Sequence, residues 1–480
     1  MNIPFSMFIC CILFWLASCK EQPNKAEKSK PVLQVEIAST NPNYFSVNHK
    51  PALLLGGSHN DNIFQDHPLE PQLDSIKKFG GNYIRCTLSS RDFANQWPFK
   101  QRPDALYDLN EFSGEYWSRL EKFLMLTQKK GIIVQLEIWD HLDFYKIAKS
   151  WAKHPFNPAY NINYTAIESN LPEEIDYFPQ EKTQPFFKTV PVLEDNQIVL
   201  TYQQKFVDKL LSHTLQYDHI LYCINNANTA NFEWSIYWAK YIKAQASKQD
   251  KSILVTDMLK DMNQLPVDLV QYLNNQFKPF IKHYQIFDFV DISLNDILRG
   301  ETHFKSINGF KALLNTKNLK SPLTSIKIFG GEQDDGNGNI EDGTERFWRN
   351  AFAGLAAVRF HRPPSGLGVN RLAQVNMLSL RMLSDSLDFF NLYPANHLLS
   401  QRKANEAFCL ANPDKEYAIY YPGCGEVVLN TGNYRGALKI KWLNILKAHW
   451  EEQYSEDISG QLVLRSPCEG KWAVWIRKEK

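Results

Sequence analysis

The sequence lacks several signals that would assign a function directly. Its 480 residues carry 53 basic and 52 acidic side chains, so it has no basic excess of the kind expected for a nucleic-acid or polyanion partner. No GxGxxG or GxxxxGKS loop follows the first predicted strand, which excludes the common nucleotide-binding motifs. No GxSxG nucleophile elbow occurs, and the His and acidic residues show no specific metal-ligand spacing. We therefore expect neither a cofactor nor a metal.

Cysteines are also too few and too scattered to define a site. Of the eight, three lie in the N-terminal 19 residues, and five lie in the body of the chain: Cys86, Cys223, Cys409, Cys424 and Cys468. Five is an odd number, and no CxxC occurs among them. These features indicate neither a disulfide framework nor a zinc site.

The N-terminus contains an apolar run that is too short for a comfortable membrane-spanning helix. The run ends in the residues LASC, positions 16–19, which resemble the lipobox of bacterial lipoproteins. The resemblance implies a signal peptide over residues 1–19 and a lipid on Cys19; an ordinary signal peptide cut near Ala17 is the alternative. Lys20, in place of the Asp that retains lipoproteins at the inner membrane, favours the outer membrane, facing the periplasm or the exterior. Residues 20–33 are charged and poor in apolar side chains, which predicts a flexible tether and no other membrane contact.

Short apolar runs alternate with amphipathic helical patterns between residues 34 and 395. Helices are predicted at 69–81, 115–131, 233–248 and 345–356. The eight predicted strands span 52–58, 82–88, 132–139, 219–227, 253–258, 289–295, 325–332 and 357–361. Such alternation predicts an α/β protein with a parallel (β/α)8 TIM barrel, with an open doubly wound sheet as the alternative.

Two segments depart from this alternation. Residues 140 to 200 are rich in Pro, Asn and aromatic residues and show little periodicity. Because they follow a barrel strand, we expect them on the C-terminal face as the wall of a substrate cleft; mere decoration of the barrel is the alternative. From residue 396 to 480, short alternating runs are separated by Gly, Asn, Asp and Pro, which predicts a small antiparallel β-sandwich.

Several stretches resemble a known family. The stretches NPNYFSVNHKPALLLGGSHND, VQLEIWDHLDF, HPFNPAYNINYT, YDHILYCINN and DGTERFWRNAFAGLAAVRFHRPPSGLGVN are similar to the clan-A type of glycoside hydrolase barrel, especially its apiosidase-like bacterial group. The tail from EAFCLANPDKEYAIYYPG to KWAVWIR resembles the module called collagen-binding in such proteins. The resemblance implies an enzyme that acts on a carbohydrate as a monomer.

The resemblance also implies two catalytic carboxylates: an acid/base Glu at the end of strand four and a nucleophilic Glu at the end of strand seven. Retaining glycosidases hold such a pair roughly 5–5.5 Å apart. Glu332 ends the seventh predicted strand, although it could instead be a solvated loop carboxylate. Strand four reads Asn226-Ala227 where Asn-Glu is implied, and alanine cannot transfer a proton. Glu233 fits the start of the next helix better.

Two carboxylates at the end of strand three could substitute for the missing acid. Glu137 and Asp140 flank Trp139 in the stretch EIWDH, and strand alternation predicts that Glu137 and Trp139 share one side. A pair that either carboxylate forms with Glu332 would span the barrel, and a separation of roughly 6.5–9.5 Å suits an inverting reaction. The alternative is that Glu137 forms a structural ion pair with Arg85.

Further strand-end residues are candidate substrate contacts: His59, Arg85, Trp139, Asn225, Asn226 and His361. We expect Glu332, Glu137 or Asp140, Asn226 and His361 to converge in one pocket, roofed partly by residues 140–200. Three hypotheses follow. The chain is a lipid-anchored glycoside hydrolase-like protein, a catalytically silent barrel that binds glycans for uptake, or a surface adhesion protein whose sandwich is the working part.

Overall fold

The computed structural model describes most of the chain beyond its first 32 residues. The described residues are Met1, 33–92, 94–145, 149–178, 181–226, 230–259, 268–293, 298–332, 336–467 and 469–479. The predicted signal peptide, Cys19 and the tether up to residue 32 lie outside this set, apart from Met1, and so does Ala227. Leu33–Lys480 forms one compact unit.

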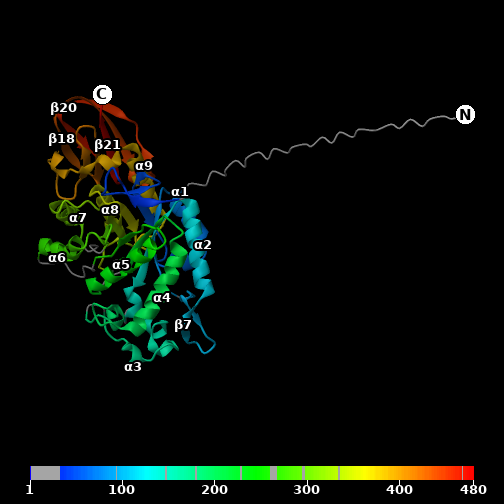
Figure 1. Cartoon of the computed structure of the whole chain (residues 1–480). Coiled ribbons are helices and arrows are strands. Elements are labelled where there is room, and N and C mark those ends of the chain that lie inside the picture. The colour runs from blue at the N-terminus through cyan, green and yellow to red at the C-terminus, as the bar shows by residue number, and fades with distance from the viewer. Residues whose placement is uncertain are drawn as a thin grey trace. The chain divides into compact units, whose positions relative to one another are not determined.

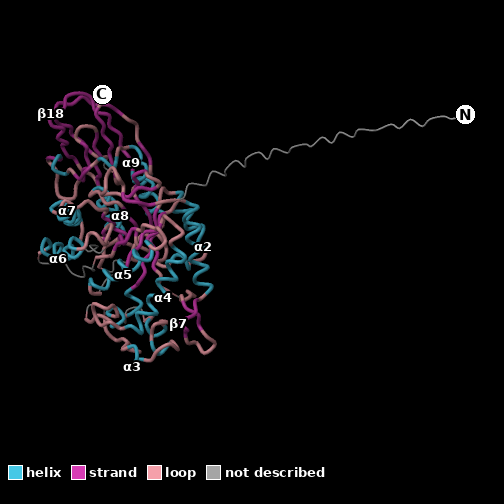
Figure 2. The backbone as a smooth tube through the Cα atoms, viewed as in Figure 1, coloured by secondary structure: helices cyan, strands magenta, loops and turns pink. Residues whose placement is uncertain are grey.

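The core of this unit is a nearly closed barrel of eight parallel strands (Figures 1 and 2). The strands are β4 (Leu54–Gly57), β5 (Tyr83–Thr87), β8 (Ile133–Asp140), β9 (Ile220–Asn226), β10 (Leu254–Thr256), β11 (Val290–Asp291), β12 (Leu323–Ile328) and β13 (Ala357–Phe360). Each coincides with one of the eight predicted strands. The first strand, β4, pairs with the last, β13, so the predicted barrel is confirmed and an open doubly wound sheet is excluded. Between β10 and β11 an isolated bridge, Met258 to Asp291, completes the ring, flanked by backbone hydrogen bonds from Asp288 N to Val255 O at 2.8 Å and from Leu259 N to Asp291 O at 3.0 Å.

Helices surround the strands. They are α1 (Leu69–Lys78), α2 (Gly114–Lys130), α4 (Gln197–Thr214), α5 (Phe232–Ser247), α6 (Leu269–Lys282), α7 (Gly300–Thr316), α8 (Ile340–Phe352) and α9 (Arg371–Ser386). The local sequence sets their ends: the Ser113 side chain caps α2, and Gly131 closes it in the left-handed conformation with a φ of 68°. None of the helices in the described part of the chain is long and apolar enough to cross a membrane.

The segment between β8 and α4 has short helices and a packed aromatic interior. It contains η2 (His141–Phe144), η3 (Trp151–Lys153), η4 (Pro158–Tyr160), α3 (Ala166–Ser169) and η5 (Pro185–Lys188). It is joined to the hairpin of β6 (Phe99–Gln101) and β7 (Tyr107–Phe112), because Asn163 Oδ1 accepts a hydrogen bond from Leu109 N at 2.7 Å. In Figure 1 this hairpin and α3 lie together at the end of the barrel away from the C-terminal sheet.

A short N-terminal sheet precedes the barrel. Its strands β1 (Val35–Ile37), β2 (Phe45–Val47) and β3 (Lys50–Ala52) are antiparallel. Val35 N donates to the carbonyl of Asp218 at 2.8 Å, next to the start of β9. The sheet is thereby attached to the N-terminal end of the barrel strands, away from the loops that follow them.

The predicted C-terminal β-domain is confirmed as a separate antiparallel sheet that curls around its own core. β18 forms one strand of 19 residues, bent at an irregularity between Asn430 and Arg435. It pairs with β20 along most of its length and with β21 at its second half. The strands are β14 (Tyr393–Pro394), β15 (Leu399–Ser400), β16 (Phe408–Asn412), β17 (Glu416–Tyr421), β18 (Glu426–Asn444), β19 (His449–Trp450), β20 (Tyr454–Arg465) and β21 (Trp472–Lys478).

Aromatic contacts join this sheet to the barrel helices. Trp348 of α8 stacks on Tyr420 of β17 with ring centroids 5.2 Å apart, and Phe304 of α7 lies 4.9 Å from Phe408 of β16. Leu443 and Ala473 of the sheet belong to the same continuous apolar cluster as the barrel interior. The barrel and the sheet therefore share part of one core.

Candidate active site at the barrel mouth

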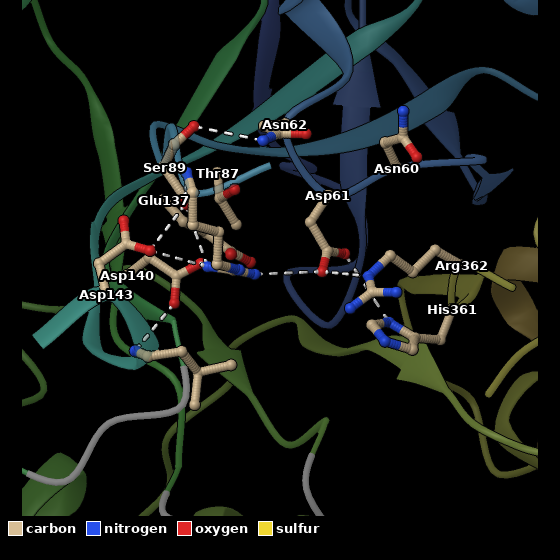
Figure 3. Close-up of polar contacts among 12 residues, drawn as sticks. Asn60, Asp61, Asn62, Thr87, Ser89, Glu137, Asp140, Asp143, His361 and Arg362 are labelled. Atoms are coloured by element: carbon tan, nitrogen blue, oxygen red, sulfur yellow. Dashed lines mark hydrogen bonds and ion pairs between the residues drawn. The ribbon is translucent and has the colours of Figure 1, made fainter. Parts of the chain in front are cut away.

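Charged and polar side chains from five strand ends gather at the C-terminal mouth of the barrel (Figure 3). They belong to β5, to β8, to β9, and to the residues that follow β4 and β13. The fold explains this gathering, because the carboxyl ends of parallel barrel strands meet at one face. The group comprises Asp61, Arg85, Thr87, Ser89, Arg91, Glu137, Asp140, Asp143, Asn226, His361 and Arg362.

Asp61, four residues beyond β4, is the centre of the ionic network. Its carboxylate accepts from Arg85 Nη1 at 2.5 Å and from Arg362 Nε at 2.7 Å, and Arg91 Nη2 lies 3.7 Å away. Burial alone would raise the pKa of Asp61, but the surrounding cations, Arg85 first, hold that pKa well below its usual range. Asp61 is therefore an ionised carboxylate that ties the first, second and eighth strand ends together.

Glu137 is bound to Arg85 inside the barrel. The guanidinium donates to both carboxylate oxygens, Nε to Oε1 at 2.5 Å and Nη2 to Oε2 at 2.7 Å, and both side chains are fully buried. Two residues earlier, Gln135 Nε2 donates to Asp291 Oδ2 at 3.0 Å across the barrel, which shows that this side of β8 faces the interior. The ion pair considered as an alternative for Glu137 is thus present, and it also occupies Arg85.

Asp140 and Asp143 share one arginine, yet their protonation differs. Asp140 forms an ion pair with Arg91, a hydrogen bond with the Asn226 side chain, and a hydrogen bond from Leu142 N at 3.1 Å. Burial would raise its pKa, but Arg91 outweighs burial and the pKa of Asp140 is lowered.

Asp143 receives weaker support from its neighbours. Its Oδ1 accepts from Ser89 Oγ at 2.9 Å and from Arg91 Nη1 at 3.3 Å. Burial raises the pKa of Asp143 to about 7, and the charge of Asp140 acts in the same direction. Near neutral pH Asp140 is therefore ionised, whereas Asp143 holds a proton part of the time. Groups whose surroundings separate their pKa values in this way can serve as base and acid.

Three buried polar atoms at the mouth have no hydrogen-bond partner among the described residues: Thr87 Oγ1, Asn226 Oδ1 and His361 Nδ1. The His361 ring stacks on Phe329 with centroids 4.3 Å apart, and its Nδ1 lies 4.0 Å from Asp61, too far for a hydrogen bond. Burial lowers the pKa of His361 well below its usual range, so the ring is neutral at pH 7. Unpartnered buried polar atoms are uncommon in folded proteins and suit a polar ligand.

The Asn225 side chain is buried and hydrogen-bonded to other residues of the protein. Its Nδ2 donates to Asp257 Oδ1 at 2.9 Å and to Ser235 Oγ at 3.0 Å, and its Oδ1 accepts from Trp234 Nε1 at 3.2 Å. Burial raises the pKa of Asp257 to about 7. These bonds hold the end of β9 against α5, so Asn225 positions its neighbour Asn226. A direct substrate contact by Asn225 stays a prediction.

The prediction that Trp139 shares a side with Glu137 is wrong. Trp139 is 3% exposed and packs outside the barrel against Phe206 of α4 and Trp238 of α5, with centroids 5.3 and 5.4 Å apart. Its register partner on β9, Asn225, also faces α5. Near the ends of β8 and β9 these two side chains therefore point outward to the helices, so a simple alternation of inward and outward side chains does not hold there. In this position the Trp139 ring is part of an aromatic core.

Two predicted residues have no hydrogen bond or ion pair to the network in the described part of the chain. His59 is exposed, and its backbone N donates to Gln72 Oε1 at 3.2 Å. Glu332 is exposed four residues beyond the end of β12, and no hydrogen bond or ion pair joins it to another described residue. Its loop is held closely: a Cβ at Gly331 would lie 2.1 Å from the Pro364 carbonyl oxygen, so only glycine fits.

The predicted convergence is therefore seen only in part. Asp140 contacts Asn226 directly, and His361 adjoins the same network through Asp61. The inclusion of Glu332 stays a prediction. Sequence reasoning missed Asp61, Arg91, Asp143 and Arg362, although each lies within four residues of a predicted or observed strand end. In the described part of the chain no cluster of three or more His, Cys, Asp and Glu could hold a metal ion.

Comparison with known proteins supports the fold. No family model matches the sequence, and no curated protein matches it either. Among solved structures, a glycoside hydrolase family 5 protein from Bacteroides vulgatus ATCC 8482 superimposes with a TM-score of 0.61 at 11% identity, covering 93% of this chain and 93% of that chain. A structure described as a glycoside hydrolase gives a TM-score of 0.59 at 12% identity, over 93% of this chain and 97% of its own. The chain therefore has the fold of glycoside hydrolase barrels.

Proposed function

We propose that this chain is a glycoside hydrolase-like protein that binds a complex polysaccharide or oligosaccharide at the barrel mouth and cleaves a glycosidic bond there. The observation that carries the proposal is the pair Asp140 and Asp143, which share Arg91 but differ in protonation. The buried unpartnered atoms of Thr87, Asn226 and His361 lie in the same group and suit the hydroxyls of a sugar.

In this proposal Asp143 is the proton donor to the leaving oxygen, a role that Ala227 cannot fill. Glu332 is the nucleophile or general base on the opposite side of the mouth. Glu137 is bound to Arg85 through both oxygens, which supports a positioning role. Asp61 and Asp140 are each in an ion pair with arginine, which supports a role in holding Arg85, Arg91 and Arg362 in place at the mouth.

A catalytically silent glycan-binding barrel is the second candidate. It is favoured by a specific observation: Asp61, Glu137 and Asp140 are each in an ion pair with arginine, as expected for a site in which carboxylates organise hydrogen-bond donors. The replacement at position 227 agrees with this reading.

One experiment separates the two candidates. Wild type and Ala227→Glu are compared on a natural glycoside and on an aryl glycoside with an acidic leaving group, which needs no proton. If the acid is missing, only the aryl glycoside reacts in wild type, and Ala227→Glu gains activity on the natural one. If Asp143 is the acid, wild type cleaves both and the new Glu adds little. Absence of turnover on either substrate in both proteins would overturn the hydrolase proposal.

We also propose that Cys19 carries a lipid that anchors the protein to the outer membrane. The motif at 16–19 and the polar tether support this. Labelled palmitate should be incorporated into wild type and not into Cys19→Ser, which should leave the membrane fraction. The resemblance to the apiosidase-like group and to the collagen-binding module is also part of this proposal. Release of apiose from a substrate would support an apiosidase activity. Binding of collagen by the full chain would support a collagen-binding role for the C-terminal sheet.

A further inference from the structure

We propose that the β12–β13 side of the mouth is a subsite for an anionic sugar, with Lys327 and Arg362 binding its carboxylate or sulfate group. This inference rests on the proposed function in that it names the class of glycan bound at the same mouth. It concerns binding, so its test does not depend on turnover.

Lys327 is a buried cation without a counter-ion. It lies one residue before the end of β12 and is only 5% exposed, and no hydrogen bond or ion pair joins it to another described residue. Its neighbour Ile328 is in register with Phe360, which stacks on Phe347 of α8 at 4.4 Å, so that side of the strand faces the helices. Lys327, on the alternate side, faces the barrel interior just below the mouth.

A second cation next to Lys327 also lacks an acidic partner. Arg359 of β13 is fully buried and donates from Nη1 to the carbonyl of Ile326 at 2.8 Å and from Nη2 to the Ser58 hydroxyl. No carboxylate of the described residues lies within ion-pair distance of Arg359. Lysine and arginine are rarely this buried unless paired, so the two positive charges indicate a missing anion.

Arg362 places a third cation at the rim. Its side chain is 37% exposed; Nε donates to Asp61 at 2.7 Å and Nη1 to the Pro363 carbonyl at 3.3 Å. Its Nη2 has no partner among the described residues. Arg362 directly follows His361, and the charge of Lys327 helps to lower the pKa of that histidine, so the guanidinium and the ammonium adjoin the same ring. A guanidinium with a free N–H and an ammonium suit a carboxylate or sulfate ester.

The charges of the described mouth residues do not balance. Asp61, Glu137 and Asp140 match the three arginines that bind them, Arg85, Arg91 and Arg362. Asp143 holds a proton part of the time. Asp291, on β11 next to β12, is hydrogen-bonded to Ser293 and Gln135, and burial raises its pKa to about 6, so it carries a negative charge at pH 7. With Asp291 counted as ionised, one positive charge of Lys327 and Arg359 stays without a matching carboxylate and is offset only in part by Asp143; in this buried region electrostatic attraction is strong. The formal charge of +1 for the whole chain conceals this local excess.

The test compares matched acidic and neutral polysaccharides by affinity electrophoresis of the mature chain. Polygalacturonate is paired with fully methyl-esterified pectin, and dextran sulfate with dextran. Wild type should bind at least one acidic member more tightly than its neutral partner. Lys327→Met should weaken that binding about tenfold or more, as expected for loss of a charge-assisted contact. The exposed residue Lys305 of α7 provides the control variant, Lys305→Met, which should bind like wild type.

Thermal unfolding without ligand gives a second readout. Removing a buried unpaired charge should leave the midpoint of Lys327→Met equal to or above that of wild type. Preference for polygalacturonate would identify a carboxylate ligand, and preference for dextran sulfate a sulfate ester. Equal binding of acidic and neutral partners, or wild-type binding by Lys327→Met, would overturn the subsite. Acid-selective binding without any hydrolysis would overturn the catalytic proposal and leave the subsite standing.

Discussion

Individual carboxyl groups at the mouth differ because of the cations around them. Glu137 has both oxygens bonded to Arg85, Asp140 has an ion pair with Arg91, and Asp143 has only a longer contact with that arginine. The sequence shows all three within seven residues, but not which of them an arginine neutralises. Those arginines come from β5 and the loop beyond it, about fifty residues earlier in the chain. The choice of acid could therefore not be made from local sequence.

Asp143→Asn tests the acid directly. On a natural glycoside cleaved by wild type, kcat/KM should fall by about 10²–10⁴-fold, because general acid assistance is lost. An aryl glycoside with an acidic leaving group should be affected far less. Since Asp143 must hold its proton and has a pKa of about 7, wild-type kcat/KM should decline above pH 7. That decline should disappear in the variant.

Asp288→Asn is the matched control for this profile. Asp288 precedes β11 at the opposite end of the barrel, and burial raises its pKa as well. The Asp288→Asn substitution should leave the dependence of kcat/KM on pH unchanged. A profile of Asp143→Asn that still declines above pH 7 would assign the acid to another residue.

Glu332→Gln should abolish hydrolysis and leave the unfolding temperature nearly unchanged. The side chain is exposed and has no hydrogen bond or ion pair to another described residue, so the substitution removes charge without disturbing packing. Steady-state rates and thermal unfolding of the purified variant check both parts. Full activity would exclude Glu332 from the mechanism, whereas a large fall in stability would indicate a structural role.

At the scale of elements, the barrel strands were predictable and their ends were not. Apolar runs of five to nine residues located all eight strands, because a parallel strand is buried on both faces. Near the mouth β8 and β9 change facing together, which puts Trp139 and Asn225 against α4 and α5. Alternation along one strand contains no information on such a change. The segment after β8 was expected on the correct face, and its aromatic residues form a packed interior.

Phe186→Ala tests whether that segment is part of the barrel core. Phe186 is fully buried, stacks on Phe144 at 4.2 Å and contacts Trp139 at 5.5 Å. Truncation should reduce the free energy of unfolding by about 3–5 kcal/mol. Phe178→Ala, at a position 41% exposed, should change it by less than about 0.5 kcal/mol. Denaturant unfolding measures both, and a loss below about 1 kcal/mol at Phe186 would mean a loosely attached lid.

At the scale of the whole molecule, the C-terminal sheet is joined to the barrel through buried aromatic residues. Trp348 stacks on Tyr420, and Arg402 of the sheet domain forms an ion pair with Glu301 of α7. The sequence predicted two regions of different secondary structure, and it could not indicate that they share a core. Alternating runs do not reveal which outer face of a sheet is apolar enough to pack on helices.

The shared core predicts that residues 33–480 unfold in one cooperative transition. Differential scanning calorimetry should give a single peak, and Trp348→Ala should shift the whole peak to lower temperature, because both regions lose packing. Two resolved peaks, of which Trp348→Ala moves only one, would contradict this expectation. That result would instead describe a barrel and a sheet that unfold independently.

The sparse pairing between β10 and β11 determines where the barrel opens first. These strands have three and two residues. One isolated bridge and two flanking backbone hydrogen bonds, Asp288 N to Val255 O and Leu259 N to Asp291 O, join their described residues, whereas β8 and β9 are paired along six register positions. Backbone amides protected by few hydrogen bonds exchange with solvent through local opening, at low free energy. Deuterium should therefore enter β10 and β11 well before β5, β8 and β9. Local opening of the barrel would begin at β10 and β11, on the side away from the Asp61 network. The strands that hold the charged groups would be the last to open.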